Sequence, residues 1–458
     1  MRDGDPLRID LPPAVATVLA VLHGAGDEAV LVGGCVRDLV RGERPADWDI
    51  ATSAPPEVVA QRFPGSSWEN PFGTVTVRDP DGGPGIEVTT YRVEAGYRDR
   101  RRPDAVRWGS SLAEDLGRRD FTINAMAWQL TVTTGDADAG NGRLVDPFGG
   151  AADLAAGVLR AVGDPDARFS EDALRLVRAV RFANRFGLRV DPATEAAIRS
   201  HAGDAAALSG ERVRDELMRI LGGSAPPSAA FELMERLGLL EVLIPELAAL
   251  RGVPQAKPRP GDALDHSLRT ADALPADDWV LRLAGLLHDL GKATTQSDGH
   301  FLLHDQAGEV LAEQVMTRLR ASRSDTTRVA RLVRHHMFVY TSDWTDAAVR
   351  RFVRRVGAAR LPDLFALRAA DDAASGTTDP ATGGWGELRQ RAEAAIANDP
   401  LEAGHLAVSG DDLVAELGIP PGPAIGAVLA GLLEAVLEDP SLNTRDRLLA
   451  LARSVGRG

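Results

Sequence analysis

One stretch of the sequence decides the fold of the amino-terminal region: Leu31-Val-Gly-Gly-Cys-Val-Arg-Asp-Leu-Val-Arg-Gly-Glu-Arg-Pro-Ala-Asp-Trp-Asp-Ile-Ala51. The apolar residues 29–32 predict a short strand, and Gly33-Gly34 predicts a turn that needs no β-carbon. The residues from Val36 to Arg41 then begin a helix whose free amides can hold a phosphate group. The stretch therefore predicts an α/β fold with a phosphate site at its first turn.

Two carboxylates one residue apart follow this turn. Because Asp47 to Ala51 alternates like a strand, Asp47 and Asp49 are expected on one face. Mg²⁺ binds few carboxylates and shares its other positions with substrate phosphates, and two such ions can stabilise the oxygens of a phosphoryl transfer. Residues 86–92 alternate in the same way, so Glu87 is a candidate third ligand, with an ordinary exposed glutamate as the alternative. The pattern indicates two-metal nucleotidyl transfer.

Composition sets the limits of this interpretation. The 458 residues suffice for several domains, and 44% hydrophobic and 26% charged residues are ordinary for a soluble protein. The single cysteine, Cys35, cannot form an internal disulfide, and the amino terminus lacks a secretory pattern. No apolar run approaches the roughly 20 residues that a membrane helix needs. We therefore expect a cytoplasmic protein without a membrane partner.

The net charge of −14 argues globally against nucleic-acid binding, but an average over several domains says little about one groove. Lys257 and Lys292 are the only lysines, so nearly all positive charge is arginine. The arginines of interest form two clusters: Arg98, Arg100, Arg101, Arg102, Arg107, Arg118 and Arg119, then Arg175, Arg178, Arg181, Arg185 and Arg189. This local clustering is compatible with binding of RNA or a nucleotide.

The chain is predicted to contain an α/β head followed by helical domains. Apolar runs at 29–32, 74–77 and 86–91 have the length and β-branching of strands, whereas later segments are rich in helix formers. Pro and Gly in Arg251 to Asp262 predict a linker, and residues 374–384 predict a second break. The expected parts are a head with a small mixed sheet (1–150), a helical neck and body (151–250), a histidine-rich domain (262–375) and a helical tail (385–458).

A second functional pattern lies in the predicted helix from Ser170 to Ala183. Ser170 is placed to cap it, and the nearby acidic residues suit its positive end. Four polar residues recur every third position and so share one face: Asp172, Arg175, Arg178 and Arg181. An isolated Asp and Arg pair of this kind is usually a surface salt bridge, but four in register after a metal-binding head favour a functional face.

This face can select a nucleotide base. Cytosine and adenine both carry an amino group beside an accepting ring nitrogen, so an Asp can accept from the first and an Arg donate to the second. Uracil and guanine present the opposite pattern and would leave buried polar groups unpaired. A helix with such a face can therefore select CTP and ATP without a nucleic-acid template. Arg119 suits the triphosphate because a guanidinium offers a forked set of donors.

Several motifs in this order resemble the bacterial class II CCA-adding tRNA nucleotidyltransferases and their poly(A) polymerase relatives. They are Gly33-Gly-x-Val-Arg-Asp38, Asp47-x-Asp49, Arg118-Arg-Asp-Phe-Thr-Ile-Asn-Ala125, Asp146-Pro-Phe-Gly-Gly150, Glu171-Asp-x-x-Arg-x-x-Arg-Ala-x-Arg-Phe-Ala183 and Glu211-Arg-Val-Arg-Asp-Glu-Leu217. The resemblance implies Mg²⁺ on Asp47 and Asp49, and an amino-acid template of Asp172 and Arg175 supported by Arg178 and Arg181. It also implies phosphate contacts from Gly34, Arg37 and Arg119, and RNA binding by the helical neck and body (151–250). The family's flexible loop corresponds to about residues 95–108 and favours addition of C, C and A.

A third pattern is a block of histidines. Six of the nine histidines lie between His266 and His336, and the mixture of imidazoles and carboxylates suits Mn, Fe, Co, Ni or Zn. Leu287-His-Asp-Leu-Gly-Lys292 resembles the HD-domain metal phosphohydrolases, in which a dinuclear centre can generate hydroxide that attacks a phosphate ester. The alternative for each histidine is an ordinary core residue. The candidate ligands are His266, His288, Asp289, His304, His335, His336 and Asp371, whereas His300 lies in a turn and is excluded.

The sequence thus predicts an enzyme that adds C, C and A to the 3′ end of the tRNA acceptor arm from CTP and ATP. The HD domain is expected to remove phosphates from damaged RNA 3′ ends. A poly(A) polymerase shares every head motif and remains an alternative, as does an RNA-end phosphohydrolase with an idle head. Residues 409–453 predict three tail helices, whose amino termini either hold tRNA phosphates or form a packing cap over the HD domain.

Overall fold

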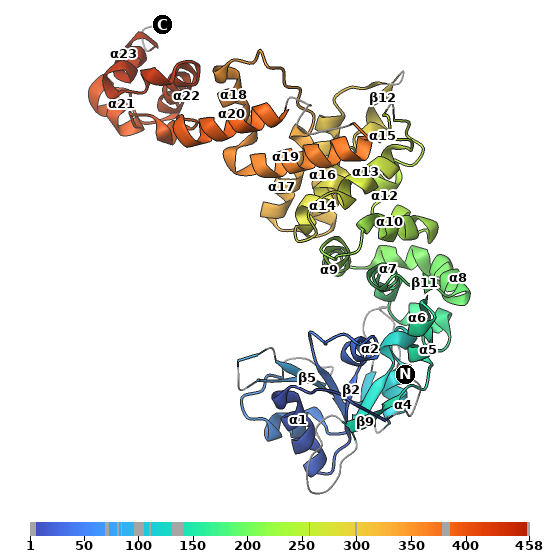
Figure 1. Ribbon diagram of the computed structural model, residues 1–458. Helices are drawn as coiled ribbons and strands as arrows, with labels where there is room; N and C mark the ends of the chain where they lie inside the picture. The colour runs from blue at the N-terminus through green and yellow to red at the C-terminus, as the bar shows by residue number, and fades with distance from the viewer. Residues whose placement is uncertain are drawn as a thin grey trace. The chain divides into compact units, whose positions relative to one another are not determined.

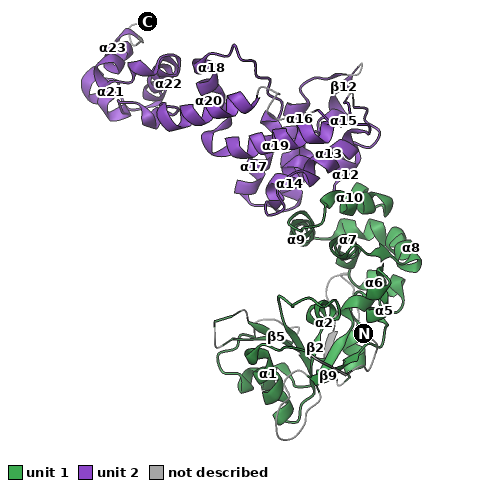
Figure 2. Cartoon of the chain, viewed as in Figure 1, with its two compact units in different colours: residues 1–243 green, residues 244–458 purple. Residues whose placement is uncertain are grey.

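The computed structural model describes residues 6–68, 73–79, 82–83, 85–95, 105–109, 111–130, 141–255, 257–297, 300–377 and 385–455. The chain divides into two units, residues 1–243 and 244–458 (Figure 2). Among the described helices, none is both long enough and apolar enough to cross a membrane.

A seven-stranded sheet forms the head of the first unit (Figure 1). Its strand order is β1-β9-β8-β2-β3-β5-β4, and only β3 and β5 are parallel neighbours among these described strands. The strands are β1 (Pro6–Arg8), β2 (Ala29–Val32), β3 (Asp49–Thr52), β4 (Thr74–Val77), β5 (Ile86–Thr90), β8 (Ala127–Leu130) and β9 (Asn141–Val145). The predicted α/β head with a mixed sheet is confirmed.

Helices α1 (Pro13–Gly24), α2 (Gly34–Val40) and α3 (Pro56–Arg62) contribute to the core of the head. The apolar faces of α1 and α2 pack with the sheet, so that Leu19, Val36 and Ile50 are fully or almost fully buried. Burial of this kind stabilises the packing of α2 on the sheet by roughly 25 cal/mol per Å² of apolar surface, and Cys35 at the start of α2 contacts the Asp49 carbonyl through its Sγ. The turn is thereby held beside the start of β3.

The rest of the first unit is mainly helical. Its helices are α4 (Leu112–Gly117), α5 (Gly150–Ala155), α6 (Pro165–Glu171), α7 (Leu174–Phe186), α8 (Pro192–His201), α9 (Gly210–Leu221), α10 (Pro227–Arg236) and α11 (Leu240–Leu243). The structure corrects the predicted cap at Ser170, which lies in the last turn of α6. The helical conformation is interrupted at Asp172. The Oδ1 of this residue accepts a hydrogen bond from the Leu174 amide at the start of α7.

Five helices of the second unit gather around the histidine block (Figure 1). They are α13 (Ala263–Asp272), α14 (Trp279–Leu287), α16 (His304–Arg318), α17 (Arg323–His335) and α19 (Leu361–Ser375). Short α12 (Pro245–Ala248) and α15 (Lys292–Thr295) accompany them. The segment predicted as a linker belongs to this unit, because Arg251 pairs with Asp262 and the Arg259 amide donates to the Ser375 carbonyl.

The predicted tail helices are α21 (Gly410–Leu417), α22 (Pro423–Glu438) and α23 (Arg445–Val455), which enclose an apolar core of their own. They follow α18 (Asp346–Val356) and α20 (Trp385–Asn398). Buried Arg350 of α18 donates to the carbonyls of Leu437 and Glu438 at the end of α22, over 2.7 and 3.1 Å. The tail therefore packs on α18 through this arginine.

Candidate active sites

The three predicted carboxylates of the head lie on one cavity. Asp49 begins β3, Glu87 lies opposite it on the parallel strand β5, and Asp47 precedes β3. All three line a cavity of 740 Å³. Burial and the neighbouring carboxylate of Glu87 raise the pKa of Asp49 to about 6, although Arg119 opposes this shift. Ionised carboxylates this close repel one another. They are therefore suited to bind a divalent cation, whose positive charge would relieve the repulsion.

The glycine turn brings two arginines to the same cavity. Gly33 has a positive φ of 73°, and a β-carbon there would lie only 2.6 Å from Arg119 Nη1. The Nε group of Arg119 is buried and has no hydrogen-bond partner among the described residues. Arg37 is 5% exposed and donates to Asn124 Oδ1 over 2.7 Å. The buried Nε donor of Arg119 and the hydrogen-bonded guanidinium of Arg37 are suited to bind an anionic ligand such as a triphosphate.

The base-reading residues predicted on the neck line this cavity as well. Asp172 Oδ2 accepts from Arg212 Nη2 over 2.7 Å. Arg175 bonds Glu171 Oε2 over 2.6 Å and the carbonyls of Arg168 and Arg118 over 3.0 and 2.8 Å. Asp172 and Arg175 are thus each fixed by a separate partner, and both side chains remain half-buried. Their roles in base selection stay predictions.

Arg178 and Arg181 bind buried carboxylates. Arg178 pairs with Asp120 over 2.6 Å, and Arg181 pairs with Glu216 of α9 over 2.5 Å. Burial opposes the charge of Asp120, but the guanidinium of Arg178 and a hydrogen bond from Asn124 lower its pKa to about 2. These two arginines therefore attach α7 to its neighbours while they line the cavity.

Several contacts in and next to this cavity were not predicted from the sequence. Arg212 and Glu216 were quoted only within a family motif, because α9 gives no local sign that it faces α7. Phe182 and Phe186 form a stacked pair whose centroids are 6.0 Å apart, and the Arg37 guanidinium lies 4.5 Å from the Phe186 centroid. Cation–π contacts of this kind join α2 of the head to α7.

Part of the predicted flexible loop lies outside the described residues. Its flanks are the paired strands β6 (Arg92–Ala95) and β7 (Ala105–Trp108). Residues 96–104, which carry Arg98, Arg100, Arg101 and Arg102, are not among those described.

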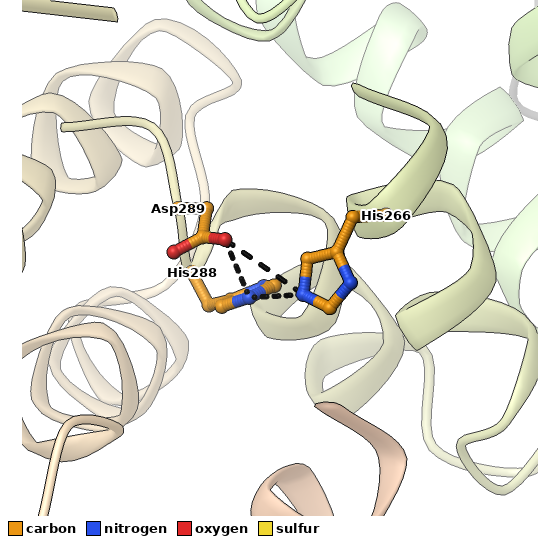
Figure 3. A group of neighbouring side chains, drawn as sticks. All are labelled: His266, His288 and Asp289. Carbon is orange, nitrogen blue, oxygen red and sulfur yellow. Dashed lines mark hydrogen bonds and ion pairs between the residues drawn. The ribbon is translucent and has the colours of Figure 1, made fainter. Parts of the chain in front are cut away.

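The histidine block forms a buried cluster in the second unit. His266, His288 and Asp289 make one group that can hold a cation, and Asp289, His304 and His336 make another. Figure 3 shows the first group, in which the ring of His266 faces His288 and Asp289. Asp371 Oδ1 lies 3.0 Å from His266 Nε2. Every one of these six side chains belongs to a residue at most 8% exposed.

Asp289 lies between the two groups. Its Oδ2 is 3.2 Å from His288 Nε2 and 3.7 Å from His266 Nε2. Its Oδ1 is 3.5 Å from the Nε2 atoms of both His304 and His336. Burial opposes the charge of Asp289, but His288 and Lys292 hold its pKa well below the usual range. A carboxylate with one oxygen toward each group can bridge two cations.

Backbone carbonyls orient three of the imidazoles. The Nδ1 atoms of His288, His304 and His336 lie 2.8, 2.7 and 2.7 Å from the carbonyl oxygens of Gly285, Phe301 and Val333. A neutral imidazole that donates from Nδ1 leaves the Nε2 lone pair for a metal, and such a partner fixes this tautomer. Burial also lowers the pKa of His266 to about 4, which favours its neutral form. The donor set therefore fits transition-metal binding.

The structure corrects one member of the predicted ligand set. His335 lies outside both ligand groups, and burial together with the charge of Arg355 lowers its pKa to about 4. Successive residues of a helix point about 100° apart, so His335 and His336 at the end of α17 do not face the same cluster. His300 is exposed and also lies outside both groups.

Three protein-family models match parts of the chain. Residues 29–160 match the poly A polymerase head domain, and residues 263–374 match the HD domain. Residues 187–250 match the domain described as "Probable RNA and SrmB-binding site of polymerase A".

Curated relatives cover nearly the whole chain. The CCA-adding enzyme of Lactiplantibacillus plantarum is 34% identical over 96% of both chains. The A-adding tRNA nucleotidyltransferase of Deinococcus radiodurans is 36% identical over 89% of this chain and 91% of its own length. The crystal structure of the Bacillus stearothermophilus CCA-adding enzyme in complex with CTP is 28% identical, with a TM-score of 0.71 over 98% of both chains. The chain therefore belongs to the CCA-adding enzyme family, with a nucleotidyltransferase head and an HD domain.

Proposed function

We propose that the first unit adds C, C and A to the 3′ end of tRNA and takes CTP and ATP as its substrates. One observation carries this proposal: Asp47, Asp49 and Glu87 line the same cavity as the base-reading pair Asp172 and Arg175. A nucleotide whose phosphates lie at the carboxylates can thus present its base to α7. The CTP complex of the Bacillus stearothermophilus relative supports this interpretation.

In the proposed reaction, the 3′ hydroxyl of the RNA loses its proton and attacks the α-phosphate. A new P–O bond forms, the bond between the α- and β-phosphates breaks, and pyrophosphate leaves. Asp47, Asp49 and Glu87 would hold Mg²⁺, which supplies positive charge for the attacking and leaving oxygens. Arg119, Arg37 and the backbone of Gly34 orient the triphosphate, since a guanidinium binds phosphate with a fork of donors.

The hydrogen bonds of Arg175 support base selection. Three of its five N–H donors bond Glu171 and the carbonyls of Arg168 and Arg118. In the described part of the structure, this leaves donors on Nε and Nη2 for the ring nitrogen and carbonyl of cytosine, or the ring nitrogen of adenine. Asp172 can accept from the amino group of either base. Uracil would bring its carbonyl to the Asp172 carboxylate and be rejected.

Product sequencing tests this proposal and separates it from its alternatives. The full-length protein with Mg²⁺ is incubated with tRNAs that end before the tail, after C, or after C-C, and each nucleotide is supplied singly and in pairs. Addition that completes C-C-A and then stops supports the proposal. The Deinococcus radiodurans relative makes addition of A alone a second candidate, which would extend only the tRNA that ends in C-C. A long A tail would identify a poly(A) polymerase.

We also propose that the second unit hydrolyses phosphate esters at RNA 3′ ends with a dinuclear transition-metal centre. The bridging position of Asp289 between the two histidine groups supports this proposal. His266, His288, Asp289 and Asp371 would hold one cation, and Asp289, His304 and His336 the other. These residues would hold metal that supplies hydroxide from water at neutral pH. Attack at phosphorus would form a new P–O bond while the bond to the sugar oxygen breaks, and that oxygen would take up the proton that the water lost.

A phosphate-release assay tests the HD activity. RNAs that end in a 3′-phosphate or a 2′,3′-cyclic phosphate are incubated with full-length protein loaded with Mn²⁺, Co²⁺, Ni²⁺ or Zn²⁺. Released phosphate is measured for the first substrate. Opening of the ring to a phosphomonoester is measured for the second, because ring opening alone releases no phosphate. Asp289→Ala is expected to abolish turnover, whereas Asp49→Ala should retain it. Equal turnover by the wild-type protein and Asp289→Ala would contradict the proposed centre.

We place the domain limits near residues 150, 250 and 375. We also propose that the tail packs on the rest of the second unit and does not bind tRNA. The amino terminus of α21 is closed by the capping box of Ser409 and Asp412, which leaves an acidic side chain where a phosphate would bind. Arg350 of α18 donates a hydrogen bond to the Leu437 carbonyl of α22, which supports the packing role. Unchanged tRNA affinity after deletion of residues 405–458, in a protein that stays folded, supports this role, and a large loss of affinity would favour tRNA binding by the tail.

A further inference from the structure

The only two lysines of the chain both lie beside the HD cluster. Lys257 Nζ is 2.8 Å from His266 Nε2 and 2.9 Å from Asp371 Oδ1. Lys292 Nζ is 2.6 Å from Asp289 Oδ2 and 3.1 Å from the side-chain oxygen of Gln255. Two ammonium groups thus contact residues that are expected to bind metal cations.

The two ammonium groups are unequally distributed over the cluster. We define the first side as His266, His288, Asp371 and Oδ2 of Asp289, and the second side as His304, His336 and Oδ1 of Asp289. Both lysines bond atoms of the first side. Among the described residues, no lysine or arginine pairs with Asp289 Oδ1. Positive charge therefore already neutralises one side of the cluster.

The contact of Lys257 with His266 uses an atom that a metal would need. Nε2 of a neutral imidazole that accepts a hydrogen bond has one lone pair, and a metal binds through the same lone pair. Asp371 Oδ1, which lies 3.0 Å from His266 Nε2, also accepts a hydrogen bond from Lys257 over 2.9 Å. The ammonium and a divalent cation therefore compete for the same two donor atoms, and like charges at this range repel strongly inside a protein.

We propose that Lys257 is a built-in competitor for the divalent cation of the first side, so that the cluster binds its first cation on the second side. This inference rests on the metal centre proposed above. Without the competitor, the first side would have the larger donor set, with four donors against three. Lys257 thus sets the order in which the two cations bind.

The surroundings of Lys257 allow its side chain to move while its backbone stays in place. Its side chain is 23% exposed and lines a cavity of 480 Å³ that also contains Lys292 and Arg368. The flanking backbone is held, since the Arg259 amide donates to the Ser375 carbonyl over 2.9 Å. A displaced ammonium would remain in this cavity, where it can contact the phosphate of an incoming ester.

Titration of the full-length protein with Mn²⁺ tests the inference. Asp47→Asn and Asp49→Asn are introduced as a common background, so that the head does not contribute binding. Calorimetry gives the two affinities, and electron paramagnetic resonance detects the spin coupling that appears when both sides are loaded. In this background we expect two classes of site whose affinities differ by at least about tenfold.

Lys257→Met should tighten the weaker site by at least about tenfold and leave the tighter site within about twofold. Lys257→Arg retains the charge and should preserve the separation. Arg368→Met is the matched control, because it removes a charge from the same cavity while its partner is Asp372 rather than a ligand. Its two affinities should stay near those of the background.

Two results would overturn the role of Lys257. One is unchanged affinity of both sites in Lys257→Met, and the other is an equal gain in Arg368→Met, which would indicate a general effect of charge. Either result leaves the dinuclear centre standing. Absence of Mn²⁺ binding in both the background and Lys257→Met would instead contradict the metal centre, and the inference with it.

Discussion

The head and the HD domain both gather carboxylates for phosphate chemistry, but they expose them differently. Asp47 and Glu87 of the head are exposed on a cavity of 740 Å³, whereas the HD ligands are at most 8% exposed beside a cavity of 480 Å³. Exposed carboxylates suit a Mg²⁺ ion that shares its ligands with a triphosphate. Buried imidazoles suit a transition metal that stays with the protein. The head site therefore suits a metal ion that binds together with its substrate, whereas the HD site suits a metal ion that binds to the protein alone.

The two sites also differ in how their ligands are positioned. In the head, Asp49 meets Glu87 through the parallel pair β3 and β5. In the HD domain, the ligands lie on several separate helices or directly at their ends, and backbone carbonyls orient the rings of His288, His304 and His336. Substitutions in one site should therefore leave the other intact, since no described ligand is shared between them.

The largest expected effect is the loss of nucleotide addition in Asp49→Ala. Removal of this carboxylate takes away a proposed ligand of the ion that stabilises the reacting oxygens, so we expect kcat to fall by at least about 10³-fold. Extension of tRNA ending in C-C with ATP measures it. Release of phosphate by the HD domain serves as the internal control, and wild-type extension by Asp49→Ala would refute the assignment of the head metal.

The reciprocal change is His288→Ala in the HD domain. His288 is fully buried and its Nε2 lies 3.2 Å from Asp289, so its loss should weaken Mn²⁺ binding by about 10²-fold or more. Calorimetry on the protein that carries Asp47→Asn and Asp49→Asn measures this affinity. Addition of C and A to tRNA is measured in parallel with the head intact, and a parallel loss of addition would show that the two sites are not independent.

Local patterns predicted most of the residues in both sites, because alternation in strands and recurrence in helices are short-range properties. Gly34, Asp49 and Glu87 reach the same cavity as expected from such patterns. The direction in which a side chain points from a helix was harder to predict. His335 and His336 are adjacent, and only His336 belongs to the cluster. A sequence shows both imidazoles without showing which one faces inward.

Long-range partners could not be predicted in this way. Arg212 reaches Asp172 from 40 positions along the chain, and Lys257 reaches Asp371 across 114 positions. Proline and glycine around Lys257 indicated a linker, yet tertiary hydrogen bonds fix this segment in the second unit. Turn composition reports local backbone preference and carries no information on such contacts.

A smaller effect is expected for Arg212→Ala, which tests how the base is read in the head. Arg212 holds Asp172 Oδ2 over 2.7 Å, so its loss should leave the carboxylate held only through Oδ1, by the Leu174 amide, and less precisely oriented. We expect discrimination of CTP against UTP to fall by about tenfold, while the KM for tRNA changes little. Single-turnover rates with each nucleotide measure this ratio. Arg212→Lys should restore part of it, and Arg199→Ala on the exposed face of α8 is the control.

The smallest effect concerns the pH dependence of stability in the first unit. The pKa of buried Asp120 is lowered to about 2, below its unfolded value near 4, through Arg178 and Asn124. Its ionised form therefore stabilises the folded state fully above about pH 4, and this contribution is lost as the pH falls toward 2. A shift of about two pKa units corresponds to roughly 2–3 kcal/mol of unfolding free energy. Asp120→Asn should lose this amount at neutral pH.

Chemical denaturation between about pH 7 and 3 measures the effect. The stability difference between the wild-type protein and Asp120→Asn should be constant near neutrality and shrink below about pH 4, because protonation then removes the same charge from the wild-type protein. Asp166→Asn, in which an exposed carboxylate is replaced on α6, is the matched control and should show no such convergence. A difference that stays constant down to pH 3 would mean that packing of Asp120, rather than its charge, holds Arg178 in the cavity wall.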